Sequence, residues 1–60
     1  MDTINAIQYA KELLAAHGDK AEAEAAQKAA GLEARGDRAQ AESWRRVRKA
    51  IRELRATNVS

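Results

Sequence analysis

The side chains of this 60-residue chain that could perform chemistry are one histidine, scattered carboxylates and a dense row of cations. His17 is a candidate proton donor, but no nucleophile with a base and no paired acid and base can be assembled around it. A structural role is the alternative, because a cation in the last turn of a helix interacts favourably with the helix dipole. With no cysteine and a single histidine, the donor set is also a poor one for zinc. The sequence therefore predicts no enzyme, no catalytic residue, no metal site and no cofactor.

The cations gather near the C-terminal end of the chain. Residues 37–60 carry a net charge of +4 and residues 1–36 a net charge of −2. The basic stripe comprises Arg38, Arg45, Arg48, Lys49, Arg52 and Arg55. A basic helix face can lie along phosphates, so the candidates for binding nucleic acid or an acidic partner are Arg45, Arg48, Lys49, Arg52 and Arg55. The other interpretation is a solvated face balanced by acidic residues of the preceding helices, in the same subunit or a second one.

Glycine and aspartate mark the two turns that separate the predicted helices. Gly18-Asp19 and Gly36-Asp37 each join a residue that tolerates the left-handed conformation to one that caps a following helix. The segments 18–24 and 36–42 are alike, which is typical either of a tandem repeat or of two similar turn-and-cap solutions. We therefore predict an all-α fold of three short helices in a single domain over residues 1–60. The helices are expected near residues 3–17, 19–35 and 37–56, with residues 57–60 as a frayed tail.

The expected helices differ in their apolar patterns. In the last one, Trp44, Val47, Ile51 and Leu54 are spaced three, four and three residues apart, as in a coiled coil or an antiparallel bundle. Apolar residues of the first helix cover about half of its circumference, more than one neighbour can bury. The second helix has alanines on two faces and is expected in the middle, forming an antiparallel hairpin with the third. The predicted interface residues are Ile4, Ile7, Leu14, Trp44, Val47, Ile51 and Leu54.

Large apolar side chains are few in this sequence. The hydrophobic fraction is 45%, but most of it is alanine, which favours helix and buries little area. Such a short chain is near the lower limit for folding without a disulfide, a bound metal or a second subunit. We therefore expect the helical bundle to be completed as a homodimer. No stretch is apolar enough to cross a bilayer, and the first residues lack the pattern of a leader. These features favour a cytoplasmic protein that does not engage a membrane.

Two resemblances add to this interpretation. The first resemblance depends on a set of turn and core residues: His17-Gly18, Leu32, Gly36-Asp37, Ala41, Trp44, Val47, Ala50-Ile51 and Leu54. In these residues the chain resembles a family of very short alphaproteobacterial helical proteins of unassigned function. That resemblance implies a bacterial, cytoplasmic origin. More loosely, Ala23 to Leu54 is similar to one tetratricopeptide unit with Gly36-Asp37 at its inner turn, although the aromatic residue of its first helix and its terminal proline are missing. This second resemblance implies a helical hairpin.

The sequence as a whole favours a non-catalytic module for protein–protein interaction or oligomerisation. Its expected first partner is a second copy of the chain, and another protein is the next candidate. The alternative, from a different class, is a small nucleic-acid-associated protein that uses the basic stripe.

Overall fold

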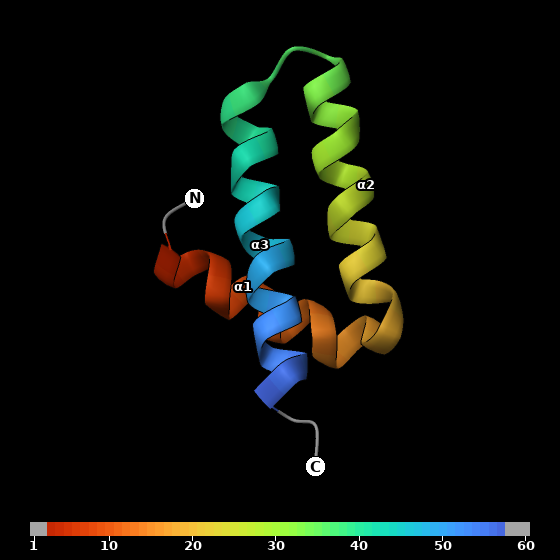
Figure 1. The fold of residues 1–60 in the computed structure, drawn as a ribbon, viewed down its shortest axis with the longest axis vertical. Coiled ribbons are helices and arrows are strands. Elements are labelled where there is room, and N and C mark those ends of the chain that lie inside the picture. Colours follow the sequence, from red (N-terminus) through yellow and green to blue (C-terminus); the bar gives the residue numbers. More distant parts are fainter. Residues whose placement is uncertain (1–2, 58–60) are drawn as a thin grey trace.

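A computed structural model describes residues 3–57, and the side chains of residues 5–56, as an all-helical protein. Helix α1 spans Thr3–His17, a 3₁₀ turn η1 spans Gly18–Lys20, helix α2 spans Ala21–Ala34 and helix α3 spans Arg38–Thr57. Helices α2 and α3 form the predicted antiparallel hairpin, and α1 crosses the base of that hairpin (Figure 1). Helix α3 includes Thr57, which the sequence assigned to the tail, and residues 58–60 lie outside the described part of the chain.

The prediction of three helices separated by two tight turns was wrong at the first turn. Helical residues run without a break over 3–34 and then over 38–57, so α1 and α2 are two arms of one bent helical stretch. Gly18 has a φ of 58°, which produces the bend. Asp19 does not stand at the start of α2 as expected, because Lys20 occupies the cap position there and makes no side-chain cap.

The second turn was predicted correctly. Gly36 has a φ of 83°, and its N–H donates to the Glu33 carbonyl at 3.0 Å, while the Asp37 N–H donates to the Leu32 carbonyl at 2.9 Å. These two bonds form the Schellman arrangement that ends a helix. Asp37 then begins α3, because its Oδ1 accepts a hydrogen bond from the Gln40 N–H at 3.2 Å.

We expect Gly36→Val to lower the free energy of unfolding by about 1–2 kcal/mol, because a β-branched side chain is strained at positive φ. Open space surrounds the position where a Cβ would lie, so the loss would come from backbone conformation and not from a clash. Thermal or urea unfolding followed by circular dichroism measures the change. Gly31→Val is the control, since Gly31 lies inside α2 with similarly open surroundings. Equal losses in the two variants would contradict the role given to the left-handed turn.

Helix α3, and not α2, is the central element. It packs against both α1 and α2, whereas α1 meets α2 mainly around η1 (Figure 1). Its seam residues Val47 and Ile51 are fully buried, and Trp44 and Leu54 pack around them. Alanines supply the opposing surfaces, and the buried members are Ala6, Ala10, Ala21 and Ala25. Because these side chains are small, the three helix backbones approach closely around two large residues.

Candidate functional site

The predicted interface residues divide into an inner and an outer group. Val47 and Ile51 have no solvent exposure, so they already serve the core of one chain. Leu14, Trp44 and Leu54 are half-buried at the edge of that core. Ile7 is 40% exposed, and the side chain of Ile4 lies outside the described residues. A second copy could therefore reach only the outer members without rearranging the core.

Three of the outer members share one side of the molecule, which we call the apolar flank: Ile7, Leu14 and Leu54. Ile7 and Leu14 lie two turns apart on one stripe of α1. Leu14 and Leu54 line a shallow groove of about 350 Å³ with Lys11 and Ala15. Ile7 lines a second hollow of about 200 Å³ together with Ala6, Arg46, Lys49, Ala50 and Glu53. The flank is thus an apolar strip with a mostly charged rim.

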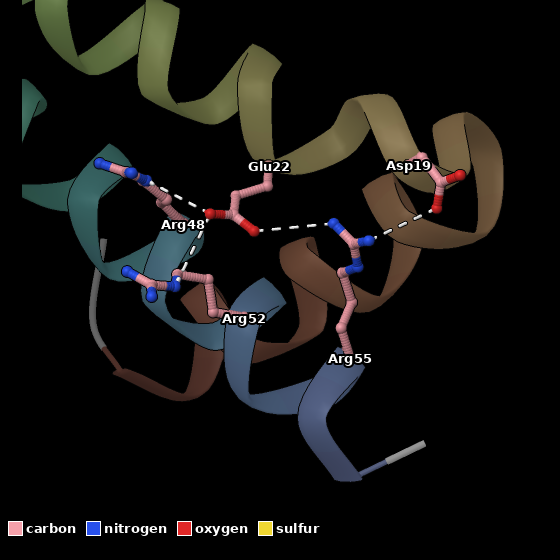
Figure 2. Close-up of polar contacts among 5 residues, drawn as sticks. All are labelled: Asp19, Glu22, Arg48, Arg52 and Arg55. Carbon is pink, nitrogen blue, oxygen red and sulfur yellow. Dashed lines mark ion pairs between the residues drawn. The ribbon is translucent and has the colours of Figure 1, made fainter. Parts of the chain in front are cut away.

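The basic stripe is largely matched by acidic side chains of the same chain. Glu22 of α2 is the centre of this match: its carboxylate lies 3.8 Å from Arg48 Nε, 3.7 Å from Arg52 Nε and 3.7 Å from an Arg55 terminal nitrogen (Figure 2). Asp19, in η1, lies 3.5 Å from the other terminal nitrogen of Arg55. These ion pairs, which we call the electrostatic clamp, join α3 to the corner between α1 and α2.

Nearer the N-terminal end of α3, two more arginines have acidic partners. Arg45 donates to a Glu33 carboxylate oxygen across the hairpin. Arg46 lies 3.4 Å from Glu42, its i,i+4 neighbour on the helix. For Lys49, no acidic side chain lies within 4.0 Å among the residues whose side chains are described. The same holds for Arg38, so among the described residues four of the six cations of the stripe have an acidic intramolecular partner and two have none.

The outer face of α3 forms a shallow groove of about 580 Å³. We call it the basic groove, and it is lined by Arg45, Arg48, Lys49, Arg52, Glu53 and Ala56. Four of the five residues that were candidates for binding nucleic acid or an acidic partner are therefore brought together. The fifth, Arg55, lies instead around the helix, beside Asp19 and Glu22.

Sequence reasoning missed another concave site, the three-helix cleft. Its volume is about 500 Å³, and it is lined by Tyr9, Leu13, His17, Glu24, Gln27, Lys28 and Trp44. Tyr9 and Trp44, the only aromatic residues of the chain, meet there edge to face with ring centroids 5.2 Å apart. Their separation in sequence leaves no periodic signal, so only the crossing of α1 over α3 shows that they touch.

A carboxylate–imidazole pair lies at the polar end of this cleft. His17 Nδ1 is 3.0 Å from Glu24 Oε2, an ion pair when the imidazole is protonated. The contact is a close approach and not a hydrogen bond, because this oxygen, which is shielded from solvent, accepts no hydrogen bond from the described residues. No serine, threonine or cysteine lines the cleft, and the buried Ser43 hydroxyl donates to the Ala39 carbonyl at 3.2 Å. The pair is accordingly a contact between the last turn of α1 and α2, without an adjacent nucleophile.

Comparison of the chain with known protein families, with curated proteins and with solved structures finds no match. Within the described residues, no helix is both long and apolar enough to span a membrane. In the same part of the chain, no three histidine, cysteine or carboxylate side chains gather as a potential metal site. The two family resemblances of the sequence therefore remain predictions.

Proposed function

We propose that the protein is a non-catalytic, cytoplasmic interaction module whose first partner is a second copy of itself. The observation that carries the proposal is the apolar flank, where Ile7 is 40% exposed beside the half-buried Leu14 and Leu54. A 60-residue chain has little apolar surface to leave outside its core. Covering the flank completes the burial of three large side chains in each copy.

A symmetric dimer uses this flank twice. In an isologous interface the same patch meets itself, so every contact made by Ile7 or Leu14 occurs in both directions. Complete burial of a large aliphatic side chain contributes about 1.5–3 kcal/mol. The part of Ile7 that is still exposed would add a fraction of that from each copy.

The rim of the flank also fits a second copy. Lys49 and Glu53 lie one turn apart on α3 and line the hollow beside Ile7. If two α3 helices approach in antiparallel fashion, Lys49 of each copy faces Glu53 of the other. Such reciprocal charge pairs set register and orientation more than they add affinity. This pairing, unlike the apolar strip alone, distinguishes a second copy from a partner with a uniformly acidic surface.

We expect Ile7→Ser to reduce self-association and Tyr9→Ser to leave it intact. The two side chains are similarly exposed, at 40% and 38%, but Ile7 belongs to the apolar flank and Tyr9 to the three-helix cleft. Sedimentation equilibrium gives the apparent mass, and unfolding midpoints measured over a range of protein concentrations give an independent readout, since a dimer melts higher when more concentrated.

Three results would contradict the proposal. A parent protein that sediments as a 6.6 kDa monomer, with a midpoint independent of concentration, removes the dimer. Dissociation caused by Tyr9→Ser but not by Ile7→Ser moves the interface to the cleft. Equal loss of mass in both variants, with circular dichroism spectra like the parent, removes the special role of the flank.

A further inference from the structure

We propose that the basic groove on the outer face of α3 binds the phosphate backbone of a nucleic-acid duplex. The groove brings together Arg45, Arg48, Lys49 and Arg52, and Glu53 is the only acidic side chain among the described residues that line it. The apolar residues of the flank do not line the groove, but Lys49 and Glu53 border both surfaces. The protein would then have two adjoining surfaces that share these two residues, one for its own copy and one for a polyanion.

The intramolecular ion pairs leave the arginines of the groove able to bind. Glu22 contacts Arg48 and Arg52 through Nε, at 3.8 and 3.7 Å. Figure 2 shows the terminal nitrogens of both guanidinium groups pointing away from Glu22. The side chains of Arg48 and Arg52 remain 47% and 66% exposed. Glu22 therefore restrains the side-chain stems, while the terminal nitrogens stay free to donate to phosphate oxygens.

Within one chain, Lys49 adds a cation that no described acidic side chain neutralises. It lies on the same outer face of the helix as Arg45 and Arg52, three to four residues from each. Its ammonium group can contact a phosphate as a point charge. Arg45 contributes less, because one of its terminal nitrogens already donates to Glu33.

The spacing of these cations favours a duplex over the other polyanions. Arg45 and Arg52 are separated by roughly 10 Å along the helix axis at 1.5 Å per residue. Over the same length one strand of a duplex has about three phosphates, at ~3.4 Å per phosphate. An extended acidic peptide turns only every second side chain to one surface, hence about one or two carboxylates over that length. No aromatic side chain lines the groove, which disfavours base stacking with a single strand.

The test is a salt series with a fluorescently labelled DNA duplex of mixed sequence, with binding followed by anisotropy. We expect log K to fall with log salt with a slope of about −3, since each phosphate neutralised contributes about −0.9. Arg52→Gln should weaken binding several-fold at low salt and reduce the slope by about one. Arg35→Gln, which removes the same charge at the tip of the hairpin, should leave the slope unchanged.

A gain-of-binding pair keeps the test decisive if an arginine variant folds poorly. Glu53→Gln should tighten duplex binding, because it removes the one acidic side chain of the groove, whereas Glu12→Gln on the exposed face of α1 should not. Equal effects within each pair would overturn the proposal, since net charge alone would then explain binding. A labelled poly-glutamate peptide that binds as tightly as the duplex would overturn it in favour of an acidic protein, and a single strand that binds more tightly would overturn the duplex assignment.

Discussion

Replacing Ile51 with alanine should lower the free energy of unfolding by about 2–5 kcal/mol, the usual cost of truncating a buried isoleucine. Ile51 has no solvent exposure, and Ile51 and Val47 are the largest fully buried side chains among the described residues. The buried residues of α1 and α2 in the same core are alanines, whose short side chains cannot move in to fill the cavity. Urea unfolding of the variant and the parent at one protein concentration measures the change.

The matched control is Ile7→Ala, the same truncation at a side chain that is 40% exposed. It should lower the free energy of unfolding of the monomer much less, because the removed atoms bury less apolar area. Both variants are compared at concentrations low enough to avoid self-association. If Ile51→Ala costs no more than Ile7→Ala, the seam of α3 is not the core of a single chain, and the packing described for the α1–α3 crossing is incorrect.

Replacing Glu22 with arginine should destabilise the protein by about 2–3 kcal/mol, given that an exposed ion pair contributes about 0.2–1 kcal/mol. The change removes attraction to Arg48, Arg52 and Arg55 and puts a fourth cation among them. Repulsion then replaces attraction at the same separations. The loss should shrink as salt is raised, because mobile ions screen exposed charges.

Glu42→Arg provides the control for this charge reversal. Among the described residues Glu42 pairs only with Arg46, and its side chain is 64% exposed. The reversal there should cost under about 1 kcal/mol, the upper range for an exposed pair. If the two reversals cost the same at low salt, Glu22 is not the centre of an electrostatic clamp and the cations of α3 are simply solvated.

Local sequence signals were sufficient for the hairpin and insufficient for the corner. Gly36-Asp37 forms the predicted turn because its glycine and capping aspartate make their hydrogen bonds to residues within five positions of them. Gly18-Asp19 has the same two residue types, but there Asp19 interacts with Arg55, which lies far away in the sequence. A contact of that range cannot be predicted from turn chemistry, so the continuous bend through η1 was missed.

The sequence pattern also did not predict which helix lies in the middle. The seam of Val47 and Ile51 was recognised as apolar, but its place inside one chain depends on Ala6 and Ala10 allowing α1 to cross closely. The alanines on a second face of α2 were taken to indicate a middle helix, whereas Ala23 and Ala30 are exposed. Small residues permit close approach without specifying which helix approaches.

The functional surfaces were predicted unevenly for a similar reason. Cations spaced along one helix reveal a shared face from periodicity alone, so the basic groove could be anticipated. The three-helix cleft could not, because Tyr9 and Trp44 meet only through the crossing of α1 over α3. The acidic side of the clamp was expected only in general terms, since the spacing of Glu22 after Asp19 indicates a helix cap and not a partner for the arginines of α3.

The central claim, self-association through the apolar flank, is tested most directly by an isotope-filtered nuclear Overhauser experiment. An equal mixture of carbon-13-labelled and unlabelled protein, at millimolar concentration, reports only contacts between different copies. We predict intermolecular signals joining the methyl groups of Ile7 to those of Leu14 and Leu54. Filtered signals that join only Tyr9 and Trp44 to the other copy, or no filtered signal from a protein that tumbles as a monomer, would contradict the claim.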